Sequence, residues 1–286
     1  MHIKTTFKTA RALATTAIIL LPALSAHADP VKDALPEKFR QAGVLKVGEV
    51  SPYIPYIWKD EATGELTGFE VDVGRAIGER LGVTWDITET KWEGLITGVG
   101  AQRYDVGGAG ASDIEERRSV VTFINFQLDS MAIVVLDKNK ERFPTIDSLC
   151  GESIGTLKGT ENVTIAREVS DDCVAKKLPP LKLNMYTSIP DADLALRSGR
   201  DAAQTVQTSQ ANFVIRSGEQ PWTIVQDGYK PTATGFYVSA NSPDLANAIQ
   251  LAAKDLYQSG KLQSLMAKYG LEGNTFEPMI NDMPKQ

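Results

Sequence analysis

Residues 108–119, with the sequence GAGASDIEERRS, run from small residues into a cluster of alternating charge. These charges could form the exposed face of a short helix, because mixed charges usually lie in water. An arginine in the cluster could instead hold an anion. A planar guanidinium matches a carboxylate with two parallel bonds, and each charge-assisted bond contributes about 1.5 to 3 kcal/mol. The segment alone leaves both possibilities open for Arg117 and Arg118.

The scarcity of histidine and cysteine limits the chemistry of this chain. Both histidines, His2 and His27, lie in the first 28 residues. The remainder therefore lacks Ser-His-Asp and Cys-His systems and most zinc sites, since each needs an imidazole or several thiolates. We expect no catalytic residue, no metal and no cofactor. Cys150 and Cys173 should form one disulfide in an oxidising compartment, and two free thiols are the alternative.

The first 28 residues have the three parts of a secretory signal peptide. Lys4, Lys8 and Arg11 precede the apolar run ALATTAIILLPAL and the small residues AHA, with no acid among them. We expect cleavage near Ala28 and a soluble periplasmic protein. Without these three positive charges the net charge falls from −6 to −9. An acidic chain without a basic run is a poor nucleic-acid binder, so we expect no nucleic-acid partner. We also expect a monomer.

The sequence after the signal peptide shows strand and helix patterns in alternation, and these predicted elements hold the charged segment in place. Apolar runs predict strands over 44–48, 83–87, 152–157 and 202–208, and the YDV segment predicts a short strand that leads into GAGAS. Helical spacing predicts helices over 68–82, 94–100, 191–199 and 241–260, the last capped by Ser242. Strands separated by helices imply parallel sheets covered on both faces, and about 258 residues after the signal suggest two domains.

Six segments of the chain follow one another in a recognisable order. They are VGEVSPYIPYIWKDEATGELTGFEVDVGRAIGERLGV, WEGLITGVGAQRYDVGGAG, SDIEERRSVVTF, IGTLKGT, LALRSGRDAA and TGFYVSANSPDLANAIQ. Over about residues 45–270 this order resembles family 3 extracellular solute-binding proteins, the receptors of polar amino-acid ABC importers. The resemblance implies the α/β type II periplasmic-binding-protein fold, with a ligand cleft between two lobes. It places lobe 1 at 29–134 and 235–286, lobe 2 at 135–234, and the crossover strands near AIVVL and TGFYV.

The resemblance also implies the first-lobe contacts. Arg117, which ends an S-x-x-x-x-R segment, would hold the ligand carboxylate, while Arg118 would face solvent. Ser112 and the backbone of Gly110 would offer acceptors to an ammonium. Aromatic walls would come from the PYIPYIW and KWEGL segments, namely Tyr53, Tyr56 and Trp92, although any aromatic can instead pack in a core.

In the second lobe the resemblance places Gly159, Thr160 and Glu161 of KGTEN at the cleft, and there the chain departs from the family. Glu161 stands where a small hydroxyl residue is usual, and its carboxylate would repel an anion unless it pairs with a cationic group. Gln207 stands where the family has the aspartate that binds an α-ammonium, and a one-residue gap would place Val206 there instead. Either Glu161 holds the ammonium, or the ligand is not an ordinary α-amino acid.

The resemblance implies the solute-binding component of an ABC importer, which would deliver a small carboxylate-bearing solute, such as an amino acid or a derivative, to an inner-membrane permease. Closure of the lobes would bury the solute and create the surface that the permease meets. A secreted enzyme of the cyclohexadienyl-dehydratase type uses the same fold and is the alternative. A sensory ectodomain would need a membrane span after it.

Overall fold

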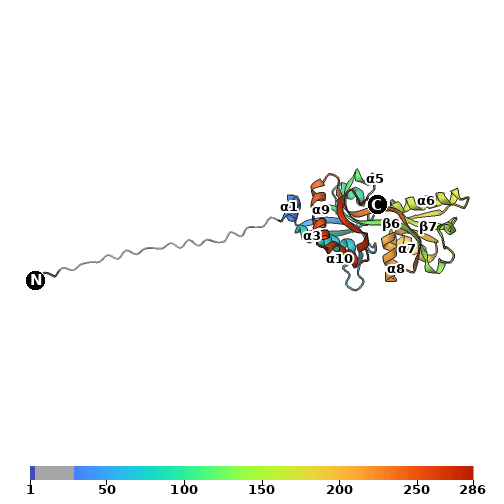
Figure 1. The fold of residues 1–286 in the computed structure, drawn as a ribbon, viewed down its shortest axis with the longest axis horizontal. Coiled ribbons are helices and arrows are strands. Elements are labelled where there is room, and N and C mark those ends of the chain that lie inside the picture. Colours follow the sequence, from blue (N-terminus) through green and yellow to red (C-terminus); the bar gives the residue numbers. More distant parts are fainter. Residues whose placement is uncertain (4–28, 286) are drawn as a thin grey trace.

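The computed structural model describes residues 1–3 and 29–285, so the expected cleavage point and most of the expected signal peptide lie outside the described residues. Figure 1 shows two α/β halves, with α3, α9 and α10 in one and α6, α7 and α8 in the other. Strand β6 runs between the halves. This arrangement confirms the expected two-lobed α/β fold.

One nine-stranded sheet runs through both lobes in the order β4-β1-β5-β10-β6-β9-β7-β8, and β11 pairs with β6. Its strands are β1 (Val44–Val50), β4 (Thr84–Thr90), β5 (Val106–Gly107), β6 (Val121–Leu136), β7 (Ser153–Leu157), β8 (Lys182–Tyr186), β9 (Ala203–Gln207), β10 (Trp222–Ser239) and β11 (Thr275–Ile280). β1 is parallel to β4 and β5, and β7 is parallel to β8 and β9. The long strands β6 and β10 are antiparallel and belong to both lobes.

The crossover lies near the middle of β6 and β10. Residues before it pair with β11, as Asn125 does with Met279, whereas Met131 and Val134 already pair with β9 of lobe 2. This pairing favours a crossing near Asp129, earlier in the chain than the expected boundary after residue 134. The register of β10 shifts repeatedly between Ile224 and Gly235, which allows the strands to bend as they pass from one lobe to the other.

The predicted helices form with small changes at their ends. The α-helices are α1 (Pro30–Ala34), α2 (Glu37–Ala42), α3 (Phe69–Leu81), α4 (Leu95–Gly100), α5 (Glu115–Arg118), α6 (Glu161–Ala175), α7 (Ile189–Ser198), α8 (Thr208–Ser217), α9 (Pro243–Gln258) and α10 (Lys261–Ala267). Ser242 occupies the N-cap of α9, but its hydroxyl accepts a bond from Gln102 and does not cap the helix. Within residues 29–285 we find no helix long and apolar enough to cross a membrane.

Alternate residues of β6 bury both faces of the lobe 2 sheet. Met131 and Ile133 lie in one hydrophobic cluster with α6, and Ala132 and Val134 lie in another with α8. This alternation follows from the two-residue period of a strand, and helices on both faces remove the sheet from water. A larger cluster in lobe 1 packs α3, α9 and α10 against β1 and β10. The sheet therefore holds the strand ends, and the loops that follow them, in fixed positions.

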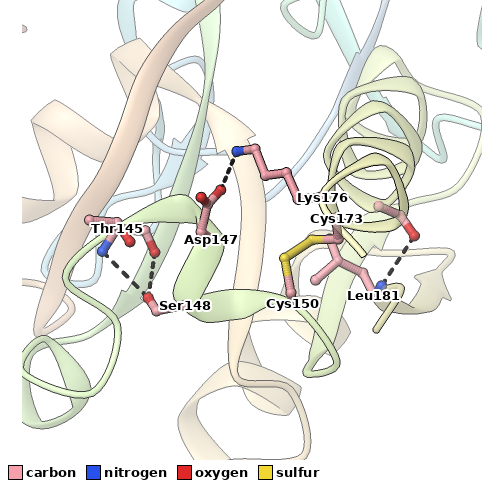
Figure 2. Close-up of a disulfide and its surroundings, with 8 residues drawn as sticks. Thr145, Asp147, Ser148, Cys150, Cys173, Lys176 and Leu181 are labelled. Atoms are coloured by element: carbon pink, nitrogen blue, oxygen red, sulfur yellow. Dashed lines mark hydrogen bonds and ion pairs between the residues drawn. A yellow bond between two sulfur atoms is a disulfide. The ribbon is translucent and has the colours of Figure 1, made fainter. Parts of the chain in front are cut away.

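The expected disulfide between Cys150 and Cys173 is confirmed, and it joins the segment before β7 to the last turn of α6. Figure 2 shows it beside an ion pair between Lys176 and Asp147, which are 2.5 Å apart. The ion pair links the same two segments but is exposed, so it adds little stability. The disulfide is the stronger link between them.

Replacing both cysteines by serine should lower the free energy of unfolding by about 3 kcal/mol, because the unfolded chain gains the entropy of an open loop. Urea unfolding of the oxidised protein and the double variant measures this difference. Lys176→Ala is the matched control, with a loss of at most about 1 kcal/mol. An unfolding free energy equal to that of the wild type would contradict the structural role of the disulfide.

Candidate ligand-binding cleft

A small cavity of about 30 Å³ lies between the lobes at the carboxyl ends of their strands. This is where ligands bind in open α/β sheets. It is lined by Val50, Tyr53, Trp92, Ala109, Gly110, Ala111, Ser112, Arg117, Met131, Leu157, Thr160, Glu161, Asn162, Ile189 and Gln207. All the contact residues expected from the sequence line it, except Tyr56 and Gly159.

Arg117 reaches this cavity from the single turn of α5. Its guanidinium carbon lies 5.1 Å from the centroid of the Trp92 ring, and its Nη1 donates to the Ser112 carbonyl at 2.8 Å. Burial lowers the pKa of Arg117, as expected for a cation removed from water. It forms no ion pair with any residue of the described ranges. A partly buried cation in this state can be compensated by a ligand carboxylate.

Arg118 is only partly the solvent-facing residue that the sequence suggests. Its side chain is 40% exposed, yet its Nε donates to Asp113 at 2.6 Å. The buried Asp113 carboxylate also accepts from Asn125 Nδ2 at 2.6 Å. Arg118 therefore neutralises a buried acid of its own lobe. Arg117 keeps its guanidinium for the cavity.

Gln207 of lobe 2 links the lobes through hydrogen bonds to Gly110 and Tyr53 of lobe 1, and all three residues line the cavity. Its Nε2 donates to the Gly110 carbonyl at 2.9 Å, and its Oε1 accepts the hydroxyl proton of Tyr53. Burial raises the pKa of Tyr53 well above its ordinary value, so the hydroxyl remains a donor at neutral pH. Both ends of the amide are thus engaged by residues of lobe 1. A carboxylate at this position could not donate to the Gly110 carbonyl.

The first turn of α6 brings acceptor atoms to the lobe 2 wall. Thr160 lies at the N-cap, but its hydroxyl donates to the Leu157 carbonyl at 2.7 Å. Glu161 Oε2 and Asn162 Oδ1 are buried without a hydrogen-bond partner among the described residues. The sequence reasoning missed Asn162, and its position beside Glu161 in the first turn was the available signal.

Tyr56 and Gly159 support the cavity without lining it. The Tyr56 ring stacks on Tyr53 with centroids 4.4 Å apart, and its hydroxyl donates to Asp129 at 2.6 Å and lies 2.7 Å from Ser209 Oγ. Tyr56 thereby joins lobe 1 to the crossover strand and to α8. The Gly159 carbonyl accepts the indole proton of Trp92 at 3.0 Å, a further hydrogen bond between the lobes.

Two buried carboxyls hold the loop beneath the cavity. The Ala109 amide donates to Glu49 at 2.7 Å and to Glu70 at 2.8 Å, and the Gly110 amide donates to Glu70 at 3.0 Å. Burial raises the pKa of both acids, that of Glu70 to about 7. The sequence reasoning missed this pair. Its signal was an acid within each apolar pattern, Glu49 in VLKVGEV and Glu70 in FEVDV.

Comparison with known proteins gives a consistent picture. Residues 45–272 match the model of the bacterial extracellular solute-binding proteins, family 3. Arginine-binding protein ArgT of Corynebacterium glutamicum is 30% identical over 90% of this chain and 85% of its own. A crystal structure of an ArgBP mutant from T. maritima has 26% identity and a TM-score of 0.69, covering 84% of this chain and 98% of that one. The ancestral amino acid-binding protein AncCDT-1, a precursor of cyclohexadienyl dehydratase, shares the fold at 22% identity and a TM-score of 0.70, covering 81% and 97%.

The acid pair beneath the loop should make stability depend on pH. The raised pKa values mean that the folded protein binds these protons more tightly than the unfolded chain, so their stabilisation is lost as pH rises from about 5 through 7. Glu49→Gln removes one titrating group. The wild type loses the stabilisation from this group as the pH rises, and the variant does not. The difference in unfolding free energy, variant minus wild type, should therefore increase by about 1 to 3 kcal/mol between pH 5 and pH 8.

Urea unfolding at several pH values measures this difference. Glu116→Gln removes an exposed carboxylate of α5 and serves as the control, with a difference from wild type that stays constant. A pH-independent difference for Glu49→Gln would show that the acid pair does not bind protons more tightly on folding.

Proposed function

Because the chain belongs to the bacterial extracellular solute-binding proteins, family 3, we propose that its cleft holds a small solute by the solute's carboxylate, with Arg117 as the anchor. The observation that carries this proposal is the state of Arg117, which is partly buried, lies over the Trp92 ring and lacks an ion-pair partner in the described chain. A planar carboxylate can accept two parallel bonds from such a guanidinium.

As a member of this family, the protein is the solute-binding component of an ABC importer. In our proposal it works as a monomer in the periplasm after cleavage near Ala28, and an inner-membrane permease receives the solute. Relatives of this chain include proteins that bind arginine and cystine, which supports an amino acid or a derivative as the cargo.

Closure of the lobes converts binding into a shape that a permease can recognise. Gln207 and Gly110 lie on different lobes and are joined at 2.9 Å, as are Trp92 and Gly159 at 3.0 Å. A solute that contacts both Arg117 and the lobe 2 wall favours this closed arrangement, since only the closed state offers it all contacts. Binding energy thereby shifts the population toward the form presented to the permease.

We propose binding without turnover. The cavity has a mixed lining, with apolar surface from Val50, Met131, Leu157 and Ile189 beside the polar residues. Glu161 is the one carboxylate that lines it within the described residues, and no second acid or base faces Glu161 there to share proton transfer. Conversion of prephenate or arogenate by the purified protein would favour the dehydratase alternative instead.

Arg117→Ala should abolish recognition of carboxylate solutes while the fold persists, because the side chain makes a single hydrogen bond inside the protein. We expect the dissociation constant to rise about 100-fold or more, as two charge-assisted bonds are lost. Thermal shift with the twenty common L-amino acids, followed by calorimetry on those that raise the melting temperature, measures the effect.

Arg103→Ala provides the matched control, because Arg103 is an exposed arginine of the same lobe and its loss changes the net charge equally. The control should bind as the wild type does. If Arg117→Ala keeps wild-type affinity for every solute that stabilises the protein, the carboxylate anchor lies elsewhere and the proposal fails.

A further inference from the structure

We infer that Glu161 and Asn162 together bind the ammonium group of the solute, so the cleft selects a net-neutral zwitterion with a short, uncharged side chain. This inference rests on the proposed function, because it takes the carboxylate at Arg117 as given. It assigns the cation to the lobe 2 helix α6 and not to Gln207 at the end of β9.

The two proposed acceptor atoms, Glu161 Oε2 and Asn162 Oδ1, belong to residues that line the cavity, and neither accepts another hydrogen bond in the described chain. Asn162 is only 7% exposed, and its Oδ1 has no partner in the described chain. Glu161 Oε2 is buried and unpartnered in the same way, and both residues line the cavity. Buried polar atoms are nearly always hydrogen-bonded, and an unmet one costs about 1 to 3 kcal/mol. An ammonium has three donors and no acceptor, so it can satisfy both oxygens at once.

Gln207 is a poor competitor for this cation. Its oxygen already accepts from Tyr53, and its amide nitrogen already donates to Gly110. The Gly110 carbonyl likewise already accepts one hydrogen bond, from Gln207 Nε2. Each of these oxygens keeps one lone pair, but neither carries a charge. Glu161 and Asn162 of α6 offer unpartnered acceptors together with one negative charge.

The charges that line the cavity determine the charge of the solute. Within the described residues, Arg117 is the one cation on the lining and Glu161 the one carboxylate. Arg117 is influenced electrostatically by Glu161, yet the two form no ion pair. A zwitterion placed between them compensates both. A solute with an additional charge, such as arginine, would find no further charged residue on this lining to pair with that charge, and burial of an unpaired charge is unfavourable. The apolar residues Val50, Met131 and Ile189 and the small volume favour a short side chain.

The test compares three small amino acids with the acids that lack the amine. The probes are L-alanine, L-valine and L-leucine, their counterparts propionate, 3-methylbutanoate and 4-methylpentanoate, and L-arginine, all by calorimetry on protein freed of bound solute. Wild type should bind at least one of the three amino acids about 10-fold or more tighter than its counterpart and tighter than L-arginine. Glu161→Gln should weaken binding of that amino acid by about 10-fold or more, and it should not weaken binding of the counterpart.

Asp171→Asn is the matched control, since it removes one carboxylate from the exposed side of the same helix. It should leave every affinity unchanged. Equal affinity of wild type for amino acid and counterpart, preference for L-arginine, or an unaffected Glu161→Gln variant overturns this inference and leaves the carboxylate anchor standing. If none of the three amino acids binds while a counterpart does, the inference fails in the same way. If Arg117→Ala retains the affinities of wild type, the proposed function fails instead.

Discussion

The left-handed turn at Ala109 and Gly110 is the constraint on which both walls of the cleft depend. Their backbone φ angles are 69° and 58°, and a side chain at position 110 would meet Tyr56 at 2.6 Å and Gln207 at 2.8 Å. Glycine is therefore favoured at position 110 by conformation, and the close approach of the Tyr56 ring leaves no room for a side chain. The turn points the amides down to two buried acids and leaves the Gly110 carbonyl facing Gln207. The same loop continues to Ser112, whose carbonyl orients Arg117.

Much of this architecture could be predicted because it follows from local patterns. The two-residue and helical periods marked β1, α3 and α9, and the order of motifs indicated the two lobes. The expected crossing after residue 134 stays a prediction, and the pairing of Met131 to Val134 with β9 favours an earlier one. Residues 131–136 form an uninterrupted buried run, and a run buried on both faces does not reveal where its pairing partner changes. Only the pairing with β9 shows that these residues already belong to lobe 2.

The candidate site was harder to predict, because its roles depend on contacts between distant segments. Arg117 and Arg118 are adjacent and chemically alike, and the difference between them is the buried Asp113 that pairs with Arg118. Tyr53 and Tyr56 are three residues apart, yet one lines the cavity and the other reaches Asp129. No periodicity in the sequence encodes these pairings. The two acids beneath the loop leave only an acid within each apolar pattern as a sequence signal, since they come from β1 and α3 and meet at the backbone amide of Ala109.

We propose that the two departures from the family pattern expected at Gln207 and Glu161 act as one change. An amide at position 207 can donate to the Gly110 carbonyl and accept from Tyr53, so it strengthens contact between the lobes, but it brings no negative charge. A carboxylate at position 161 places one negative charge on the cavity lining from α6, a different element of lobe 2. Because both residues move with lobe 2, the closed state gains the interlobe amide contacts and, in our proposal, the ammonium contact in one step. A solute that lacks the ammonium would close the lobes without satisfying Glu161, and burial of that unpaired carboxylate would oppose closure. The same residue would then contribute both to affinity and to the discrimination between solutes.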